Sequence, residues 1–468
     1  MRYVSPMNST TTFTLNGRAV ELTGNAPTES LLRWLRRHHL AGTKEGCGDG
    51  DCGACTVVLV QADGAGGSRF VSVNSCLLPM GALPGREVLT VEALAEGSAL
   101  HPVQGAMVEH GGSQCGYCTP GFVMSLFAGY YGGELSDHTT EGNLCRCTGY
   151  RSIRDATAAL RLHPREKDRF DALLGAPRTA PEAATLEAFH SPMTLAAAMA
   201  LKAENPQAAF IAGGTDLGVN LSRGQTVAPV LIALDRIAEL DVIDIDETRV
   251  RIGAGVVLTR IEHELAGVFP ALDDLLPWFA ARQVRNRATI GGNLGSASPI
   301  GDLAPVLLAL DATLELAGPD GRREVTLAEF FLDYRKTVRA PDEIIVATTI
   351  PRRADLVQAC YKIAKRQTDD ISIVAAVFAI AHDAAGIVTQ ARLAFGGVAA
   401  TPKRALDVEA MLLGKRLDPE VIEAACVALK QVFTPLSDHR ASADYRRALC
   451  GNLFAKFARE KLGVEGVA

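Results

Sequence analysis

The sequence predicts a multidomain α+β protein, on three observations. The chain has 468 residues, which is enough for about three domains. Eight of its eleven cysteines lie before residue 150 in two groups, the first among strand patterns and the second among helix patterns. The remainder of the chain alternates strand patterns with helix patterns. We therefore expect small cysteine-rich domains followed by larger domains that combine helices and strands.

Composition and charge exclude several classes of function. With 48% hydrophobic and 21% charged residues, the chain has the composition of an ordinary globular protein. Its net charge of -6 provides no basic footprint, so we expect no nucleic-acid partner. The longest apolar runs, such as residues 373–381, are too short to span a bilayer, and no signal peptide is recognisable. We expect a cytoplasmic protein without a membrane partner.

The first part of the chain is expected to be β-rich. Residues 13–22 contain two short strand patterns joined by Asn16-Gly17, which is a strong hairpin signal. Thr28 is the expected N-cap of a helix that carries the apolar residues Leu31, Leu32, Leu35 and Leu40. Two further strands are expected at residues 56–60 and 70–73. A hairpin, a helix and further strands around a cysteine loop form a ferredoxin-like arrangement.

The loop of residues 46–55 contains three cysteines and four glycines. Cys47, Cys52 and Cys55 have the Cys-x4-Cys-x2-Cys spacing of a plant-type 2Fe-2S loop, and Cys76 is the expected fourth ligand. Glycines let such a loop curl around a cluster and turn N–H groups toward its sulfurs. Four thiolates could also bind zinc, but structural zinc sites favour paired knuckles over a triplet with a distant fourth ligand. We expect a 2Fe-2S cluster here.

A second set of four cysteines lies in a helical region, with helices expected at residues 101–110, 122–131 and up to Leu160. The set has the spacing Cys-x2-Cys and Cys-x-Cys, formed by Cys115, Cys118, Cys145 and Cys147. Both pairs fall at helix junctions, where exposed N–H groups favour negative charge. Zinc remains an alternative for this set alone, although a second cluster in series with the first suits electron transfer. The single cysteines are expected to be buried apolar residues: Cys360, Cys426 and Cys450.

The rest of the chain predicts two α+β domains. A helix at residues 194–202 and a strand at residues 208–212 precede Gly213-Gly214, and a second strand precedes Gly291-Gly292. Twin glycines after a strand suit a backbone close to phosphates, or form a plain turn. No Gly-x-Gly-x-x-Gly motif is present, so a Rossmann fold is not expected. The last region is expected to have strands at 371–380 and 390–395 and helices at 408–413, 419–430 and 443–461.

Together these motifs resemble the xanthine dehydrogenase family of molybdenum hydroxylases. The resemblance rests on the cysteine loops, on residues 212–216 and 290–293, and on residues 434–438 and 445–447 near the end of the chain. It implies a chain with two 2Fe-2S domains and a flavin region. The expected domains are a ferredoxin-like β-grasp domain at 10–95, an all-helical 2Fe-2S domain at 96–165, a linker at 166–184, an α+β FAD-binding domain at 185–353 and an α+β C-terminal flavoprotein domain at 354–468.

The resemblance also implies site residues. Cys47, Cys52, Cys55 and Cys76 would bind the cluster nearer the flavin, and the second set would bind the cluster nearer molybdenum. Gln114 would reach the pterin of a molybdenum cofactor on a partner. The implied FAD-binding residues are Ile211, Ala212, Gly213, Gly214, Thr215, Asp216, Phe279, Thr289, Ile290, Gly291, Gly292, Asn293, Asp302, Ile344 and Lys362, with Asp369 close to the isoalloxazine. From the residues alone, Phe279 and Ile344 could be core, and Asp302 and Lys362 could be surface charges.

The implied function is electron transfer. A large molybdopterin-binding subunit would oxidise hypoxanthine to xanthine and urate, and electrons would pass through both clusters and FAD to NAD+. No molybdenum domain is recognisable up to Ala468, so we expect the catalytic residues on that partner, in a heterotetramer of two small and two large subunits. Alternatives are a module that serves an aldehyde, nicotinate, carbon monoxide or quinoline hydroxylase, a free-standing electron-transfer flavoprotein, and a zinc-stapled structural protein.

Overall fold

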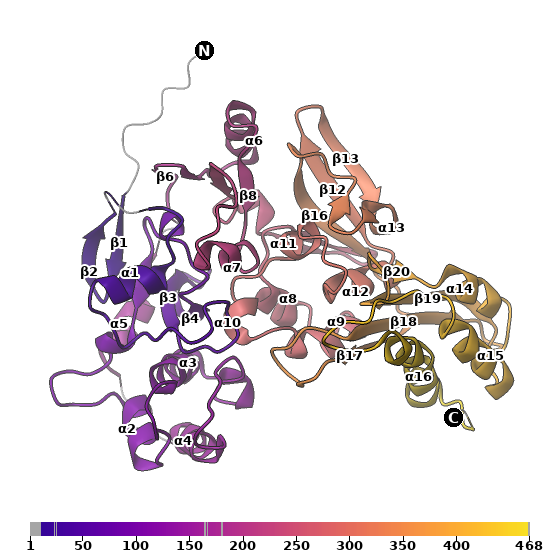
Figure 1. Cartoon of the computed structure of the whole chain (residues 1–468), viewed down its shortest axis with the longest axis horizontal. Coiled ribbons are helices and arrows are strands. Elements are labelled where there is room, and N and C mark those ends of the chain that lie inside the picture. The colour runs from indigo at the N-terminus through magenta and orange to yellow at the C-terminus, as the bar shows by residue number, and fades with distance from the viewer. Residues whose placement is uncertain are drawn as a thin grey trace. The chain divides into compact units, whose positions relative to one another are not determined.

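The structure is a computed structural model, and it describes residues 11–466 except 23, 25, 163, 164, 166, 179 and 180. The chain divides into two compact units. The first comprises the residues up to Ala238 together with the segment Ala281–Ala288, and the second comprises Glu239–Ala280 and the residues from Thr289 onward. Figure 1 labels many of the helices and strands of both units.

The first unit begins with a five-stranded sheet in the order β2-β1-β5-β3-β4. Its strands are β1 (Thr12–Leu15), β2 (Arg18–Glu21), β3 (Thr56–Ala62), β4 (Ser68–Asn74) and β5 (Glu87–Leu89), and it is accompanied by helix α1 (Leu31–Arg37). Strands β1 and β5 pair in parallel, and the other neighbours pair antiparallel. This is the predicted ferredoxin-like β-grasp domain. At the β1–β2 turn Asn16 and Gly17 have φ values of 51° and 77°, the left-handed conformation that a two-residue hairpin turn needs.

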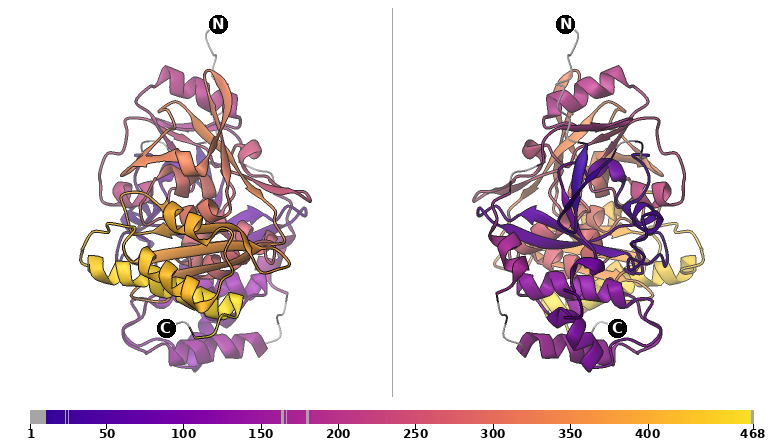
Figure 2. Two further views of the ribbon diagram at one scale, coloured as in Figure 1. Left: turned by 90° about the vertical axis from the view of Figure 1, so that its right-hand side faces the viewer. Right: turned by 90° about the vertical axis from the view of Figure 1, so that its left-hand side faces the viewer.

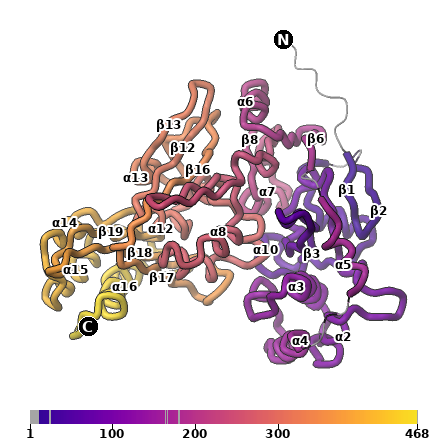
Figure 3. The backbone as a smooth tube through the Cα atoms, turned by 180° about the vertical axis from the view of Figure 1, so that it is seen from behind, coloured from indigo at the N-terminus to yellow at the C-terminus, as the bar shows by residue number. Residues whose placement is uncertain are grey.

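A helical domain follows in the same unit. It contains α2 (Pro102–Glu109), α3 (Thr119–Gly132) and α4 (Arg151–Leu162), which pack together, as Figure 3 shows. Its core includes Val58 and Val60 of β3, whereas Val57 and Leu59 belong to the core on the other face of the sheet. Strand β3 is therefore buried on both faces, because successive side chains of a strand point to opposite sides.

The first unit also contains a smaller sheet, in the order β6-β7-β9-β8. Its strands are β6 (Ala184–Leu186), β7 (Phe189–Ser191), β8 (Ala209–Ile211) and β9 (Leu231–Ala233). The helices around it are α6 (Leu195–Glu204), capped by Thr194, and α7 (Leu217–Ser222). Leu186, Phe189, Ile211 and Leu231 join the β-grasp core, so the two sheets share one apolar interior. The segment Ala281–Ala288 adds α10 (Arg282–Arg285).

The second unit begins with an antiparallel sheet in the order β10-β11-β16-β12-β13. The strands are β10 (Ile243–Ile245), β11 (Arg249–Gly253), β12 (Thr313–Gly318), β13 (Gly321–Thr326) and β16 (Ile344–Pro351). The helices of this region are α8 (Leu258–Glu264), α9 (Pro270–Leu275), α11 (Ile290–Gly295), α12 (Leu303–Ala309) and α13 (Leu327–Phe330). A small hairpin of β14 (Phe331–Asp333) and β15 (Lys336–Thr337) follows α13.

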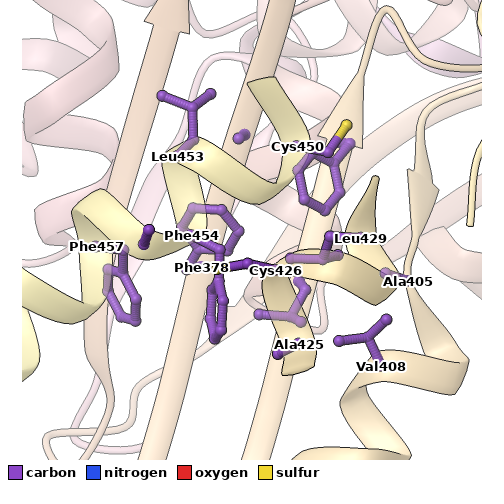
Figure 4. Packing of buried hydrophobic residues seen from close by; sticks show 14 of the residues in the cluster. Phe378, Ala405, Val408, Ala425, Cys426, Leu429, Cys450, Leu453, Phe454 and Phe457 are labelled. Atoms are coloured by element: carbon purple, nitrogen blue, oxygen red, sulfur yellow. The ribbon is translucent and has the colours of Figure 1, made fainter. Parts of the chain in front are cut away.

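The C-terminal part of the second unit is an antiparallel sheet in the order β17-β18-β19-β20. Its strands are β17 (Val357–Ile363), β18 (Val374–His382), β19 (Val388–Gly396) and β20 (Lys403–Arg404). Helices α14 (Leu406–Leu412), α15 (Pro419–Leu429) and α16 (Ala443–Leu462) pack on it, which is visible in yellow against orange in the left view of Figure 2. In the core between them, the ring of Phe378 lies 5.4 Å from Phe454 and 5.3 Å from Phe457 (Figure 4).

Most elements expected from the sequence are present, and two local predictions are wrong. Helix α1 is capped by Ser30, whose side chain accepts from the N–H of Arg33, and not by Thr28. The segment before Gly291-Gly292 is not a strand, because residues 282–285 form α10 and Thr289 caps α11. The expected linker at 166–184 contains helix α5 (Arg169–Gly175), and three of its residues, 166, 179 and 180, lie outside the described residues.

No helix in the described part of the chain is long and apolar enough to cross a membrane.

A buried histidine caps the first helix of the helical domain. His101 is 5% exposed, its Nδ1 accepts from the N–H of Val103, and its Nε2 lies 2.9 Å from the hydroxyl of Tyr131. Since Nδ1 acts as an acceptor, the ring is neutral with its proton on Nε2. Tyr131 in turn donates to Asp168, the N-cap of α5. Burial lowers the pKa of His101 to about 4, although the charge of Asp168 opposes this.

This histidine makes the helical domain sensitive to acid. Because the pKa of His101 is lower in the folded protein than its ordinary value of 6.5, the unfolded chain binds the extra proton first, and stability falls as the pH drops from about 6.5 to about 4. We expect a loss of up to about 3 kcal/mol. Hydrogen exchange of α2 and α3, corrected for intrinsic pH effects, measures it. A His101→Asn variant keeps a capping oxygen but cannot titrate, so the hydrogen-exchange protection of its α2 should vary less with pH. If protection in the variant fell with pH as much as in the unsubstituted protein, His101 would not be the cause.

Candidate cofactor sites

The first cysteine loop is shaped by its glycines. Gly48, Gly50 and Gly53 have φ values of 75°, 95° and 64°, which other residues rarely adopt. A Cβ at Gly46 would lie 2.6 Å from the Sγ of Cys52. The loop therefore needs glycine both for its backbone conformation and for room next to sulfur.

The four cysteines of the first set come together as two pairs. The N–H of Cys47 donates to the Sγ of Cys52 at 3.3 Å, and the N–H of Cys52 donates back to the Sγ of Cys47 at 3.3 Å. The Sγ atoms of Cys55 and Cys76 lie 3.3 Å apart. Asn74 supports the second pair, because its Nδ2 lies 3.9 Å from the Sγ of Cys55 and 3.3 Å from the carbonyl oxygen of Gly50.

In each pair, the pKa of one thiol is lowered and that of the other is raised. The hydrogen bond between the two side chains lowers the pKa of Cys52 to about 6 and raises the pKa of Cys47. The bond between Cys55 and Cys76 likewise lowers the pKa of Cys55 and raises that of Cys76. Thiolates are the form in which cysteine binds metal, so this environment suits metal ligation.

The second set also pairs two and two. The Sγ atoms of Cys115 and Cys147 lie 3.4 Å apart, and a hydrogen bond links the side chains of Cys118 and Cys145. Burial raises the pKa of Cys118 to about 12. Cys118 directly precedes α3, and Cys145 and Cys147 lie shortly before α4, as the sequence predicts. Cys115 and Cys147 are exposed, in contrast to the buried Cys55 and Cys76 of the first set.

The pairing of thiols suits a cluster with two metal ions. Two pairs of thiols can bind two irons, each with two cysteine ligands, as in a 2Fe-2S cluster. All eleven cysteines lie in the described part of the chain, and all are free of disulfide bonds.

The first predicted flavin loop belongs to the first unit and runs from Ile211, the last residue of β8, to Asp216, which precedes α7. A Cβ at Gly213 would overlap the carbonyl oxygen of Arg287, and Gly214 has a φ of 77°. The Nε of Arg287 donates to the carbonyl oxygen of Gly213 at 3.2 Å. The backbone of this loop is thus held against the segment Ala281–Ala288, and there is no room for a side chain at Gly213.

A buried carboxylate holds Arg287 in place. Asp235 binds Arg287 at 3.4 Å and Arg86 at 2.8 Å. Burial alone would raise the pKa of Asp235, but Arg86, Arg287 and Arg236 outweigh it and keep the pKa low. The carboxylate therefore remains charged and connects the β-grasp domain to the Gly213 loop.

The second predicted flavin loop belongs to the second unit. The Oγ1 of Thr289 accepts from the N–H of Gly292 at 3.0 Å, which caps α11. The N–H of Gly291 donates to the carbonyl oxygen of Ala254 at 2.9 Å, and a Cβ at Gly291 would lie 2.5 Å from the Cβ of Ala254. The Oδ1 of Asn293 is buried without a hydrogen-bond partner among the described residues. A buried oxygen of this kind suits a ligand that donates to it.

Asp302 and Lys362 form a buried ion pair in the same unit, so they are not surface charges. The Nζ of Lys362 lies 2.9 Å from the Oδ2 of Asp302, and their side chains are 6% and 8% exposed. Lys362 also donates to the carbonyl oxygen of Trp278 at 3.0 Å and lies 5.9 Å from the ring centre of Phe279. The other carboxylate oxygen of Asp302 is buried without a partner among the described residues, as at Asn293.

The remaining predicted residues are less closely grouped. Ile344 begins β16 and is 2% exposed, and Phe279 is 9% exposed, so both contribute to apolar packing. Asp369 is buried in the loop after β17 with a φ of 52°. Gln114 is exposed beside Cys115.

Sequence reasoning missed the residues that hold these loops together. They are Asn74, Asp235 and Arg287, together with Asn143 and Gln283, which join a buried network described below. Asn143 lies inside a cysteine motif and could have been noticed. The others are single polar residues whose partners are far away in the sequence, so no local pattern marks them.

Four families match successive parts of the chain. They are the 2Fe-2S iron-sulfur cluster binding domain at residues 13–80, the [2Fe-2S] binding domain at 90–158, the FAD binding domain in molybdopterin dehydrogenase at 183–353 and the CO dehydrogenase flavoprotein C-terminal domain at 359–461. The matches give the same order of parts as the predicted domains and name the cofactors: two 2Fe-2S clusters and FAD.

Similar proteins include curated xanthine dehydrogenases. Xanthine dehydrogenase of Emericella nidulans is 32% identical over 97% of this chain and 39% of its own length. Xanthine dehydrogenase/oxidase of Mus musculus is 32% identical over 96% of this chain and 39% of its own length. The chain thus spans about two fifths of the length of the curated relatives it matches.

Solved structures are similar over a shorter part of the chain. A chain of carbon monoxide dehydrogenase from Hydrogenophaga pseudoflava is 30% identical with a TM-score of 0.56, and the match covers 59% of this chain and 96% of that one. A chain of quinoline 2-oxidoreductase from Pseudomonas putida 86 is 26% identical with a TM-score of 0.55, over 60% of this chain and 98% of that one. The chain belongs to the molybdenum hydroxylase family, as a module with two 2Fe-2S-binding domains and an FAD-binding domain.

Proposed function

We propose that the chain is the iron-sulfur and FAD subunit of a xanthine dehydrogenase. A partner subunit hydroxylates hypoxanthine to xanthine and xanthine to urate, and the electrons pass through this chain to NAD+. One observation carries the proposal: proteins named xanthine dehydrogenase match 95–98% of this chain, from the first cysteine domain to the C-terminal helices. The matched chains of the carbon monoxide and quinoline enzymes each cover 59–60% of it.

The proposal assigns one cluster to each set of cysteines. Cys47, Cys52, Cys55 and Cys76 bind the first, and Cys115, Cys118, Cys145 and Cys147 bind the second. The two-and-two pairing of thiols supports both assignments. FAD is assigned to the loops 211–216 and 289–293 and to Phe279, Asp302, Ile344 and Lys362, with Asp369 close to its ring. Asn293, in the second loop, and Asp302 each have a buried oxygen without a partner among the described residues, which supports their assignment to the flavin site.

The residues of this chain bind and orient its cofactors. When bound, the clusters pass single electrons, and the flavin links single-electron steps to the hydride that NAD+ accepts. The glycine loop directs N–H groups at sulfur, Asn74 approaches the Sγ of Cys55, and burial of Cys55 and Cys76 excludes water. Such contacts set reduction potentials. Lys362 and Asp302 place a fixed pair of charges beside Phe279. No general base on this chain is required.

The proposal includes a partner. Cys115, Cys147 and Gln114 are exposed, and the sulfur atoms of Cys115 and Cys147 lie 3.4 Å apart. In the proposal, a molybdopterin subunit receives Gln114 here and delivers electrons to the second cluster. Two copies of each subunit form the proposed heterotetramer in the cytoplasm. A second candidate function is the same role in a carbon monoxide or quinoline enzyme, favoured by the likeness to those structures. Aldehyde and nicotinate hydroxylases, or a free-standing electron carrier, are further alternatives.

Single cysteine substitutions should separate the two clusters. Cys47→Ala removes one ligand of the first cluster, and Cys115→Ala removes one ligand of the second. We expect each variant to lose half of the iron and half of the acid-labile sulfide. Each variant should also lose one electron paramagnetic resonance (EPR) signal, and the two variants should lose different signals. Cys426→Ala, in the core of the C-terminal domain, is the control and should keep both signals. Full iron content in either ligand variant would refute that ligand assignment.

The buried ion pair should have separable effects on stability and on flavin binding. Lys362→Met leaves the carboxylate of Asp302 buried and uncompensated, so we expect it to destabilise the second unit by about 3–5 kcal/mol and to release FAD. The double variant Lys362→Met with Asp302→Leu should regain stability but not FAD. Denaturant unfolding and the flavin content of the purified protein measure the two effects. Arg353→Met, at an exposed ion pair, should cost less than about 1 kcal/mol. A double variant that binds FAD normally would remove both residues from the flavin site.

Substrate identity is tested with the assembled complex. The chain is purified anaerobically, alone and with any large subunit that co-purifies, and its visible spectrum is followed after addition of xanthine. We expect bleaching of the iron-sulfur and flavin bands only when the large subunit is present, and recovery of the bands with NAD+. Bleaching by carbon monoxide, an aldehyde or quinoline but not by xanthine would support the second candidate. Zinc in place of iron would refute both.

A further inference from the structure

Four polar side chains form a buried network in the first unit. Thr56, Ser125, Asn143 and Gln283 are each only 1–2% exposed. The Nε2 of Gln283 lies 3.0 Å from the Oγ of Ser125, 3.2 Å from the Oδ1 of Asn143 and 3.3 Å from the Oγ1 of Thr56. Ser125 also donates to the Oδ1 of Asn143 at 2.7 Å. The network therefore joins the β-grasp domain, the helical domain and the segment Ala281–Ala288.

The network converges on a contact between the two cysteine loops. The Nδ2 of Asn143 donates to the carbonyl oxygen of Gly53 at 3.0 Å. One residue away on each side, the N–H of Leu144 donates to the carbonyl oxygen of Cys52 at 3.0 Å. Cys52 belongs to the first set of thiols, and Leu144 is bonded to Cys145 of the second. This backbone hydrogen bond thus connects the two loops that carry the first and second sets of thiols.

Glycines let these loops approach without intervening side chains. A Cβ at Gly53 would overlap the carbonyl oxygen of Gly142, and a Cβ at Gly121 would overlap the carbonyl oxygen of Gly53. A Cβ at Gly142 would overlap the Oε1 of Gln283. Three separate segments therefore leave no room for a side chain at the point where the loops meet.

Packing alone does not account for the network. Buried amides and hydroxyls are costly unless every group is paired, and the Oε1 of Gln283 has no partner among the described residues. Gln283 is also not needed to attach its segment, because Arg285, with a fully buried side chain, binds Glu141 at 2.5 Å, and Asn286 donates to the carbonyl oxygen of Ser72 at 2.8 Å. An apolar residue at position 283 would fill the same space at less cost.

We propose that Asn143 and Gln283 are positioning residues for electron exchange between the two clusters. They hold the carbonyl oxygen of Cys52 against the N–H of Leu144, so that a route runs from the Sγ of Cys52 through this hydrogen bond to the Sγ of Cys145. One electron leaves the reduced cluster and one arrives at the oxidised cluster, and no atom or proton moves between them. The proposal rests on the cluster ligands assigned above, because Cys52 and Cys145 must each bind iron.

The test uses the full chain with both clusters and FAD bound. Gln283→Met keeps the length of the side chain and removes its hydrogen bonds, and Ser125→Ala is a milder second variant that removes one hydroxyl of the network. In the fully reduced protein, magnetic interaction between the two clusters splits and broadens their EPR signals. We expect both variants to keep their iron and both signals, but to show weaker splitting and a several-fold slower equilibration of electrons between the clusters after a reducing pulse.

A matched control separates positioning from general loosening of the fold. Tyr131→Phe removes a partly buried hydrogen bond to Asp168 in the same helical domain, away from the contact between the loops, and should leave the splitting and the rate unchanged. Unchanged splitting and rate in both network variants would overturn the proposal, as would an equal change in the control. If Gln283→Met loses a cluster, the splitting and the equilibration rate of Ser125→Ala decide whether the proposal holds. Absence of two 2Fe-2S signals in the unsubstituted chain would instead refute the ligand assignment itself.

Discussion

The arrangement of the first cysteine set depends on burial of both faces of β3. This strand begins immediately after Cys55, and β4 ends two residues before Cys76. Their register places Thr56 opposite Asn74, which brings the two cysteines to the same end of the hairpin with their Sγ atoms 3.3 Å apart. A slip by one residue would turn every side chain of β3 to the opposite face. Because α1 and the smaller sheet share the core on one face and the helical domain covers the other, the strand has no solvent-facing side to tolerate such a slip.

Buried charges then fix the loops that pack around this sheet. Asp235 is shared by Arg86 of the β-grasp domain and Arg287 beside Gly213, and Glu141 binds the fully buried Arg285. Such pairs add little net stability compared with apolar packing, but removal of one partner is expensive. They therefore act mainly on geometry: Arg285 and Arg287 fix the position of the segment Ala281–Ala288, and Arg287 also donates to the carbonyl oxygen of Gly213 and so holds the backbone of that loop.

The sequence predicts the parts of this structure that local chemistry determines. Asn16-Gly17 specifies a hairpin turn, the glycines of residues 46–55 specify a loop around sulfur, and cysteine spacing indicates the cofactor, because each signal lies within a few residues. The N-cap of α1 was misplaced because Thr28 and Ser30 are both good caps and only packing selects between them. Helix α10 has four residues, too few for a periodic pattern. Gln283 was missed because its partners Ser125 and Thr56 are 158 and 227 residues away.

The two cysteine sets differ in how many of their thiols reach the surface. In the first set Cys55 and Cys76 are buried and Cys47 is exposed, whereas in the second set Cys145 is buried and both Cys115 and Cys147 are exposed. Electron transfer weakens steeply with distance, so the two exposed thiols of the second set offer a partner protein a short approach to a cluster. Around the buried Cys55 and Cys76, a water-poor environment disfavours added negative charge unless N–H donors compensate it. The amide of Asn74 beside Cys55 is such a donor. Under the proposed function, electrons enter at the second set, where more thiols are exposed, and reach the flavin through the first.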